Sequence, residues 1–283
     1  MILVTGASGQ LGDALQRVGL NEEVCFASRK ECDITSEKSI NDIFDKYSID
    51  IVINCAAYTN VDLAEKQRTI TEKINVDGVK NLSKISKIRN SQIIQISTDY
   101  VFDGSKKDAY QEEDVVSPLG VYGESKAAGE RAILEEGVRG IIIRTSWLYS
   151  TNRKCFVQTI LNKSKEVDEL KIVMDQHGSP TFADDLAKCI KEIIPKLRSQ
   201  EYSGEIFHFS NEGCTNWYEF AKEIKLLRRL DVDLVGIESK NYPTSAKRPL
   251  NSVLNLNKIK NEFDIIIPNW KESLKQCLMK NQF

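Results

Sequence analysis

Three glycines close to the N-terminus constrain the fold of this chain more than any other feature of its sequence. Gly6, Gly9 and Gly12 follow the apolar run from Ile2 to Thr5 and precede a segment whose apolar residues recur at helical spacing. A strand, a G-x-x-G-x-x-G turn and a helix in this order are typical of a dinucleotide-binding turn. Gly6 would allow the tight turn, Gly9 would let a pyrophosphate approach the backbone, and Gly12 would let the helix pack closely on the sheet.

The start of the helix after this turn is suited to bind phosphate. The first N–H groups of a helix have no partner within the helix, and the helix dipole places its positive end there. A glycine-rich turn without any ligand is the alternative, but the strand before it and the helix after it favour a bound cofactor. The residues predicted to bind it here are Gly6, Ser8, Gly9, Gln10, Leu11 and Gly12.

Apolar runs alternate with helical patterns through the first half of the chain. Runs that are apolar nearly throughout fit parallel strands buried on both faces, and strands separated by helices indicate right-handed βαβ units. The expected strands are residues 2–5, 24–27, 51–55, 93–96 and 141–143, and the expected helices are residues 11–18, 40–47, 74–88, 186–197 and 217–224. A loop with two prolines is expected at residues 241–255.

These elements predict an α/β fold, with a Rossmann-type doubly wound parallel sheet and a smaller α/β substrate-binding lobe. Residues 1–149 are expected to form the NAD(P)-binding Rossmann domain, with contributions from about residues 171–200. Residues 150–283 are expected to form the smaller lobe, partly interleaved with the first.

Composition limits the partners of the chain. Its 283 residues include 39 Lys and Arg and 41 Asp and Glu, a formal net charge of −2, so it lacks the broad basic field that nucleic-acid binding requires. No apolar stretch approaches the roughly 18 residues of a membrane span. Seven cysteines without a C-x-x-C pair indicate free thiols in a reducing compartment. The chain opens on Met1 without a secretion signal, so we expect a cytoplasmic protein that binds neither nucleic acid nor membrane.

The residues after the second expected strand bear on the choice of cofactor. An acidic side chain there binds the ribose 2′-OH of NAD, whereas a basic one suits the 2′-phosphate of NADP. Here Ser28 and Arg29 follow the strand, which predicts NADPH. Solvated surface cations are the alternative, and Asp33 and Ile34 could frame the adenine instead, so NADH stays possible.

Tyr122 and Lys126 stand four residues apart, a spacing that places both on one face of a helix. Free tyrosine has a pKa of about 10, and a neighbouring lysine cation lowers the pKa by favouring the phenolate. Thr98, at the end of an apolar strand, could bind a substrate oxygen while Tyr122 transfers a proton. Together the three residues predict acid–base chemistry at a substrate oxygen.

Longer motifs carry a family resemblance that runs nearly from end to end. They occupy residues 4–12, 54–62, 97–104, 122–126 with 129–130, 144–149, 175–181 and 247–252. On these residues the chain resembles the extended short-chain dehydrogenase/reductases and, among them, the dTDP-4-dehydrorhamnose reductase family. The resemblance implies NADPH-dependent reduction of the 4-keto group of dTDP-4-dehydro-L-rhamnose to dTDP-L-rhamnose, for surface polysaccharide synthesis.

The resemblance also implies a role for each matching residue. Tyr122 would protonate O4 of the keto sugar, and Lys126 would bind the nicotinamide ribose, with Thr98 completing the catalytic set. The cofactor cleft would be lined by Ala56, Ala57, Tyr58, Tyr122 and Lys126. The sugar nucleotide would be bound by Thr59, Val61, Thr98, Asp99, Tyr100, Trp147 and Arg248, of which Arg248 suits the diphosphate and Trp147 could instead belong to the core.

No metal is expected. Some relatives bind magnesium between protomers through glutamates, but the matching positions here hold Ala14 and Asp184. Glu112, Glu113 and Asp114 are interpreted as a solvated loop.

Several alternatives stay open within and beyond this fold. Sugar-nucleotide dehydratases carry an acidic residue where this chain has Tyr100, and epimerases carry a serine-rich strand end in place of Thr98 and Asp99, so both are disfavoured. A reductase of another NDP-4-keto-6-deoxyhexose and a non-catalytic NADP-binding regulatory subunit remain. The sequence also leaves open the nucleotide base, the stereochemistry at C4, and the oligomeric state, of which a homodimer is one possibility.

Overall fold

Six parallel strands form the central sheet of the protein in a computed structural model that describes residues 1–151 and 153–280. The strands are β1 (Ile2–Thr5), β2 (Val24–Ala27), β3 (Ile51–Asn54), β4 (Gln92–Thr98), β5 (Gly140–Thr145) and β10 (Ser203–Phe209). Their order is β10-β5-β4-β3-β1-β2, so the chain changes direction across the sheet at β1. In such sheets ligands bind at the carboxyl ends of the strands beside the switch point. The predicted α/β class and doubly wound sheet are confirmed.

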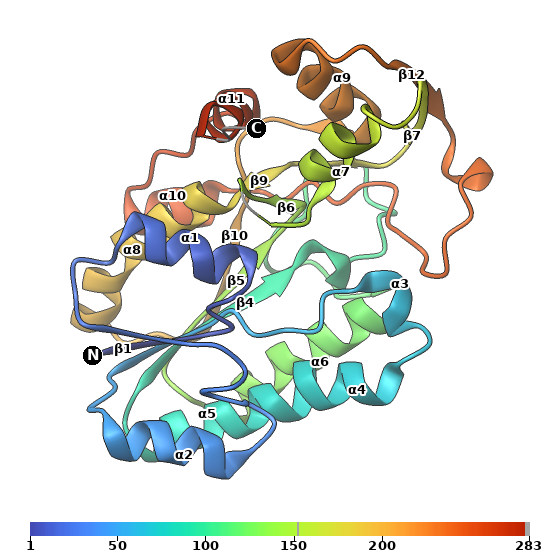
Figure 1. The fold of residues 1–283 in the computed structure, drawn as a ribbon. Coiled ribbons are helices and arrows are strands. Elements are labelled where there is room, and N and C mark those ends of the chain that lie inside the picture. Colours follow the sequence, from blue (N-terminus) through green and yellow to red (C-terminus); the bar gives the residue numbers. More distant parts are fainter. Residues whose placement is uncertain (152, 281–283) are drawn as a thin grey trace.

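Helices cover both faces of the sheet (Figure 1). On one face α1 (Gln10–Val18) packs against α8 (Ala183–Ser199), and both bury apolar side chains on the strands. The other face carries α2 (Glu37–Lys46), α5 (Gly78–Ile88) and α6 (Val121–Glu136). This second layer brings α6 against the end of β4. Within the described residues, no helix is both long enough and apolar enough to cross a membrane.

The helix expected at residues 74–88 begins earlier and is irregular. It consists of α4 (Arg68–Glu72), a π-helical turn (Lys73–Asp77) and α5. The π turn presents Asn75, whose side chain accepts from Tyr58 N at 2.8 Å and donates to Tyr58 O at 3.1 Å and Ser125 Oγ at 2.9 Å. The irregular turn therefore fixes the loop after β3 to α6. Single-turn π segments are frequent at functional sites.

A second cluster of elements lies above the carboxyl ends of the strands. It contains α7 (Phe156–Lys163), β7 (Glu169–Val173), α9 (Trp217–Arg228), β12 (Asp233–Ile237) and α11 (Trp270–Lys280), which share a separate apolar core. Two short pairs connect it to the sheet: β6 (Leu148–Tyr149) with β9 (Thr181–Phe182), and β8 (His177–Gly178) with β11 (Thr215–Asn216). The short elements α3 (Val61–Ala64), α10 (Asn257–Phe263) and the 3-10 turns Asp99–Val101 and Ser239–Asn241 complete the set.

The chain passes between the two parts more than once. After leaving the sheet at β5 it returns through α8 and β10, and it returns again through α10, which packs on β10. The division at residues 149 and 150 therefore stays a prediction. The expected loop is present as residues 242–256, which cross from the upper cluster back to the sheet and form bridges from Leu254 to Tyr110 and from Asn251 to His177.

The backbones of β4 and β5 come very close together at Gly140, the first residue of β5. Its φ is +140°, and an added Cβ would lie 1.9 Å from Ile93 O, within the β4–β5 pairing. Gly137 ends α6 at φ +64° with no atom within 4 Å of an added Cβ. We expect Gly140→Ala to lower the free energy of unfolding by about 3 kcal/mol or more and Gly137→Ala by about 1 kcal/mol, measured by denaturant unfolding. Equal losses of unfolding free energy in the two variants would contradict the close contact between Gly140 and β4 as the cause.

Candidate active site

A cleft of about 540 Å³ opens at the carboxyl ends of β1, β3, β4 and β5. A neighbouring cavity of about 310 Å³ shares Ser8, Gly9, Cys55 and Ala57 with it, and the two form one continuous trough. Most of the predicted cofactor residues line this trough: Gly6, Ser8, Gly9, Gln10, Leu11, Arg29, Asp33, Ile34, Ala56, Ala57, Tyr58, Tyr122 and Lys126. Gly12 and Ser28 were also predicted but do not line it.

The glycine turn has the shape that a diphosphate requires. Gly6 has φ +64°, and a Cβ on it would lie 2.6 Å from Ala56 N, so the turn lies directly against the loop after β3. Gly9 precedes α1 without a side-chain cap, and only Gly6 O, at 3.2 Å, would be near its Cβ. The helix N-terminus is therefore open to the trough. Gly12 packs against Ala7 in the turn, rather than against the sheet as expected.

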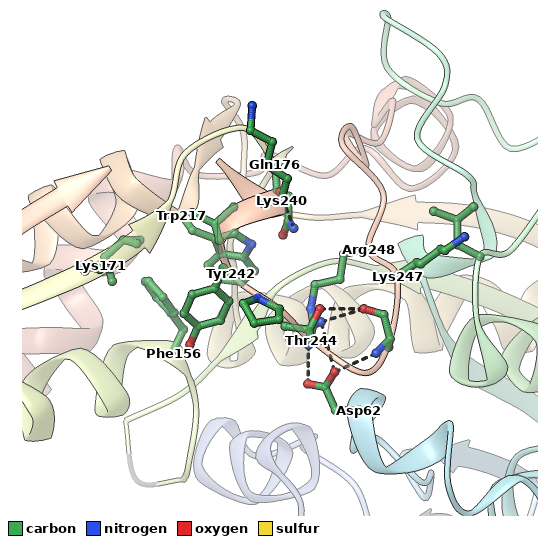
Figure 2. Close-up of a pocket in the computed structure, with 16 residues that line it drawn as sticks. Asp62, Phe156, Lys171, Gln176, Trp217, Lys240, Tyr242, Thr244, Lys247 and Arg248 are labelled. Atoms are coloured by element: carbon green, nitrogen blue, oxygen red, sulfur yellow. Dashed lines mark hydrogen bonds and ion pairs between the residues drawn. The ribbon is translucent and has the colours of Figure 1, made fainter. Parts of the chain in front are cut away.

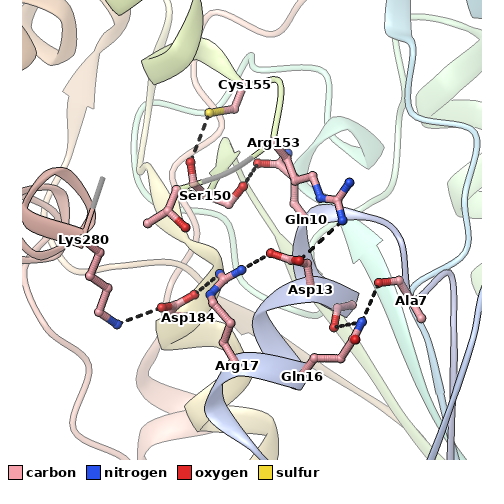
Figure 3. A network of polar contacts seen from close by, with 12 residues as sticks. Ala7, Gln10, Asp13, Gln16, Arg17, Ser150, Arg153, Cys155, Asp184 and Lys280 are labelled. Carbon is pink, nitrogen blue, oxygen red and sulfur yellow. Dashed lines mark hydrogen bonds and ion pairs between the residues drawn. The ribbon is translucent and has the colours of Figure 1, made fainter. Parts of the chain in front are cut away.

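A polar network lies between α1, the start of α8 and α11 (Figure 3). Asp184 on α8 forms ion pairs with Arg17 at 2.5 Å and with Lys280 at 3.0 Å, and Arg17 also pairs with Asp13. The Asp184 carboxylate is therefore already bound by two cations, while the expectation that no metal is bound stays a prediction. On the trough side, Gln10 joins α1 to β6 by bonding Leu148 O and Ser150 Oγ.

The three predicted catalytic side chains come together at the end of β4. Tyr122 and Lys126 lie one turn apart on α6, and Thr98 is the last residue of the strand. Lys126 is buried, and its Nζ donates to Ile96 O at 2.6 Å. A Cβ on Gly123 would lie only 2.2 Å from Tyr100 O, so this glycine permits the close approach of α6 to the 3-10 turn that follows β4.

Burial controls the ionisation of these groups. It raises the pKa of Tyr122 to about 12, although a hydrogen bond with the Thr98 hydroxyl opposes the shift. It lowers the pKa of Lys126 to about 8, against the effect of the Glu130 carboxylate. The expected lowering of the tyrosine pKa by lysine is thus wrong: desolvation of the phenolate dominates, the Asp99 carboxylate adds to the rise, and the Thr98 hydrogen bond rather than the Lys126 charge opposes it.

Asp99 holds one buried carboxylate oxygen without a hydrogen-bond partner among the described residues. It is 2% exposed; its Oδ1 accepts from Thr98 Oγ1 at 3.1 Å, and its Oδ2 has no hydrogen-bond partner within the described residues. Burial raises the pKa of this carboxyl to about 7. A buried polar atom without a partner is costly, and Asp99 lines the cleft, so a ligand hydroxyl could satisfy it.

Two stacked tryptophans form a wall of the cleft. Trp147 follows β5 with φ +46°, a left-handed conformation that is rare for a large side chain. Its ring lies against that of Trp217, the first residue of α9, with centroids 3.6 Å apart and an angle of 9° between the planes. Trp217 was interpreted from the sequence only as part of an apolar helix face, because its partner lies 70 residues earlier in the chain.

A second, larger cavity of about 680 Å³ lies on the Trp217 side (Figure 2). Phe156, Trp217 and Tyr242 contribute aromatic rings to it, and Arg248 forms an ion pair with Asp62, with Nη2 2.7 Å from Oδ2. Figure 2 shows the rings on one side of the cavity and this ion pair on the other. The cations that line it are Lys171, Lys240, Lys247 and Arg248, and Asp62 is the only lining carboxylate within the described residues.

The predicted substrate residues are divided among neighbouring sites. Thr59, Thr98, Asp99 and Trp147 line the first cleft. Val61 and Tyr100 line a narrow gap beside Tyr122, and Arg248 lines the second cavity. Tyr100 also contacts Tyr122 edge to face, with the ring centroids 5.9 Å apart.

Two acidic residues differ from the sequence interpretation or were missed by it. Glu112 was expected in a solvated loop but is 6% exposed, and its Oε1 accepts from His208 N at 3.2 Å. The burial of Glu112 could not be predicted from the sequence because its partner His208 lies 96 residues further along the chain. Asp62 received no predicted role, although it lies within one of the family-like motifs.

A Rossmann sheet, an open glycine turn and a Tyr-x-x-x-Lys pair beside the end of β4 define an extended short-chain dehydrogenase/reductase. All 283 residues match the family described as RmlD substrate binding domain. The dTDP-4-dehydrorhamnose reductase of Aggregatibacter actinomycetemcomitans is 41% identical, over 97% of each chain. The chain belongs to this reductase family, as the sequence motifs predicted.

Solved structures of such reductases have the same fold. A dTDP-4-dehydrorhamnose reductase of Clostridium acetobutylicum is 40% identical with a TM-score of 0.92, over 98% of each chain. The dTDP-4-dehydrorhamnose reductase of Bacillus anthracis, crystallised in complex with NADP, is 33% identical with a TM-score of 0.94, over 99% of each chain.

The tryptophan stack can be tested through Gly178. A Cβ at this position would lie 2.6 Å from the Trp147 ring, whose stacked partner leaves it no free space on the other face. We expect Gly178→Ala to separate the two indoles and to abolish their coupled circular dichroism signal.

The matched control is Gly236→Ala, because its Cβ would meet Met174 Sδ at 2.8 Å, the flexible end of a side chain that can move. This control should keep the coupled signal of the indoles. An unchanged spectrum in Gly178→Ala would show that the stack is not held against this glycine.

Proposed function

We propose that the protein reduces the 4-keto group of dTDP-4-dehydro-L-rhamnose with NADPH and forms dTDP-L-rhamnose, a precursor of surface polysaccharide. One observation carries this proposal. Thr98, Tyr122 and Lys126 converge in a cleft that continues into the glycine-turn trough on one side. The cleft shares its tryptophan wall with a cationic, aromatic cavity on the other side. The names of the relatives support the same substrate and cofactor.

The cleft residues have distinct tasks in this reaction. NADPH, when bound, supplies the hydride that reduces the carbonyl carbon. The hydroxyl of Tyr122 carries its proton at neutral pH, because burial raises its pKa to about 12, and it donates that proton to O4 of the sugar. The Thr98 hydroxyl, whose proton goes to Asp99 Oδ1 in the protein alone, turns to donate to the same oxygen, and the Lys126 ammonium stabilises the negative charge that develops on Tyr122. Asp99 Oδ2 accepts a sugar hydroxyl.

The trough holds the cofactor. The open N-terminus of α1 and the backbone of the glycine turn bind the diphosphate; Ala57 lines both parts of the trough, and Ala56 and Tyr58 line the smaller cavity. Arg29 lines this smaller cavity, away from Tyr122 and Lys126, and is exposed, with its Nε 3.5 Å from Asp33 Oδ2. The Asp33 carboxylate accepts from Thr35 N and Oγ1, so it is fixed beside the adenine end rather than free to bind a ribose.

The second cavity holds the nucleotide part of the substrate. Four cations surround a space that suits a diphosphate, and Phe156, Trp217 and Tyr242 offer rings for a nucleobase. Arg248 is oriented in advance by the bidentate contact with Asp62, at 2.7 and 3.3 Å. A guanidinium held in this way can present its remaining donors to a phosphate without losing further side-chain entropy.

The location and assembly of the protein are also proposals. Seven free thiols suit the reducing cytoplasm, where nucleotide sugars are made. A homodimer is proposed as the assembly, and light scattering of the purified chain would test it.

Arg29 provides a test of cofactor choice. In Arg29→Ala the 2′-phosphate loses its cation, so we expect NADPH to bind about tenfold more weakly, a change of about 1.4 kcal/mol. NADH, which lacks this phosphate, should bind as before. Fluorescence titration of both cofactors measures the difference. The neighbouring exposed Lys30→Ala is the control, and an equal loss for both cofactors would exclude a specific phosphate contact.

Turnover tests the function itself. The wild-type chain is expected to oxidise NADPH in the presence of dTDP-4-dehydro-L-rhamnose, and NMR of the product assigns its C4 stereochemistry. Tyr122→Phe removes the proton donor, so kcat should fall about 1,000-fold while NADPH still binds. Assays with the UDP and GDP analogues measure the preference for the base.

Tyr149→Phe is the matched control for this substitution. The Tyr149 hydroxyl is buried without a hydrogen-bond partner within the described residues, so its removal should leave kcat unchanged. Absence of turnover with tight NADPH binding would favour a regulatory subunit. Full activity in Tyr122→Phe would refute the assigned proton donor.

A further inference from the structure

The helix that carries Tyr122 and Lys126, α6, is capped by a residue from another part of the chain. Its N-cap residue, Gly120, has no side chain that could accept from the first N–H groups of the helix. The acceptor comes from the end of α3, where Glu65 Oε1 accepts from Val121 N at 2.9 Å across 56 residues of chain. A carboxylate beside α3 therefore fixes the start of α6 one residue before Tyr122.

Gly120 leaves room for this contact. Its φ is −160°, an extended backbone that any residue can adopt, so the conformation does not require glycine. The space does require it, because a Cβ at this position would lie 2.5 Å from Glu65 Oε1. The chain thus lacks a side-chain cap at position 120 and has a carboxylate from α3 in its place. The helix dipole also favours a negative charge at this end of a helix.

Contacts outside α3 determine where Glu65 lies, because a helix of four residues is too short to be stable alone. Asp62, one turn before Glu65, holds α3 to the chain segment around Arg248. Its Oδ1 accepts from Ala246 N at 3.0 Å, and its Oδ2 accepts from Arg248 Nη2 at 2.7 Å (Figure 2). The short helix therefore joins the start of α6 to the lining of the second cavity.

Almost no free space separates these parts of the chain. Glu65, Tyr100, Tyr122 and Ala246 all line a gap of only about 10 Å³, the lower limit for a single water molecule. In the same turn of α6, Gly123 lies against Tyr100 O, where an added Cβ would be 2.2 Å away. The Tyr122 side chain thus projects from a turn that is held by backbone contact on one residue and by Glu65 on another.

We propose that Glu65 is a positioning residue of the reductase, whose carboxylate fixes the first turn of α6 and thereby the place of the Tyr122 hydroxyl. The role in turnover rests on the proposed function, whereas the cap itself does not. Without the cap, the first turn of α6 moves more freely, and the Tyr122 hydroxyl meets O4 of the sugar less often in the geometry that proton transfer requires. Glu65 does not line the cofactor trough, so binding of NADPH is unaffected.

Hydrogen exchange of the Val121 amide tests the cap without any substrate. The N–H of the first helical residue has no partner within the helix, so its protection reports the contact with Glu65. We expect this amide to exchange about tenfold faster in Glu65→Ala than in the wild type, measured by NMR of the isotopically labelled chain. Glu65→Gln keeps an acceptor oxygen and should keep the protection. Equal protection in Glu65→Ala would overturn the cap.

Gly120→Ala removes the same contact from the other partner. The added Cβ would meet the end of a flexible side chain, so it displaces the Glu65 carboxylate and leaves the backbone in place. Exchange of the Val121 amide and kcat should therefore change as they do in Glu65→Ala. The double variant should be no worse than either single variant, because both substitutions remove one contact. Losses that multiply in the double variant would show that the two residues act separately, against the proposal.

Steady-state kinetics connect the cap to the reaction. In Glu65→Ala we expect kcat to fall about tenfold, while the Kd of NADPH from fluorescence titration stays that of the wild type. Glu65→Gln should restore kcat to within about twofold of the wild type, because the acceptor for Val121 N is present again.

Ser36→Ala is the matched control for loss of a helix cap as such. Ser36 Oγ caps α2, where it accepts from Ser39 N at 3.3 Å, so its removal should lower the melting temperature by an amount similar to Glu65→Ala and leave kcat unchanged at saturating NADPH. A wild-type kcat in Glu65→Ala, or an equal loss of kcat in Ser36→Ala, would refute the positioning role. If the wild type reduces no keto sugar, the proposed function fails, while exchange of the Val121 amide still decides the cap.

Discussion

The cleft depends on the contact between α6 and the carboxyl end of β4. This contact is possible only because position 123 has no side chain, since a Cβ there would lie 2.2 Å from Tyr100 O. One turn later, Lys126 Nζ bonds Ile96 O at 2.6 Å, and a further turn brings Glu130 to Ser97. Three successive turns of one helix are therefore fixed to one short segment, residues 96–100. The proposed catalytic groups face the same space because the helix cannot slide along the strand.

The upper cluster is held over this cleft by contacts that join distant parts of the sequence. Trp147 and Trp217 stack face to face, Arg248 reaches Asp62 across 186 residues of chain, and residues 242–256 run back to the sheet. The left-handed backbone of Trp147 costs free energy, and such conformations persist where surrounding contacts determine them. Gly178 on one face of the Trp147 indole and Trp217 on the other hold Trp147 in this conformation.

A residue's place in the structure could be predicted from the sequence where its contacts are local, and not where they join distant parts of the chain. The inner strands were predicted because strands buried on both faces are apolar throughout. Strand β10 was missed because it lies at the sheet edge, where Ser203 and Glu205 can stay exposed. Tyr122 and Lys126 were found by local spacing, whereas Trp217 and Asp62 depend on contacts between distant segments. The ionisation of Tyr122 was predicted in the wrong direction because spacing reveals a neighbouring charge but not the extent of burial.

The near-zero net charge of the chain conceals two sites that suit anions. One is the open N-terminus of α1, with Arg153 and Lys154 lining the same cleft, and the other is the cavity with four cations and Asp62. The tryptophan stack lies between them, because Trp147 lines the first and Trp217 the second. In the proposed reaction a nucleotide sugar must place its keto group at Tyr122 while its diphosphate stays beside Arg248. The rings at this wall and the free oxygen of Asp99 therefore limit which face of the sugar can turn toward the cofactor. Stereochemistry at C4 thus follows from how the two sites are joined, since Tyr122 can protonate the oxygen after attack on either face.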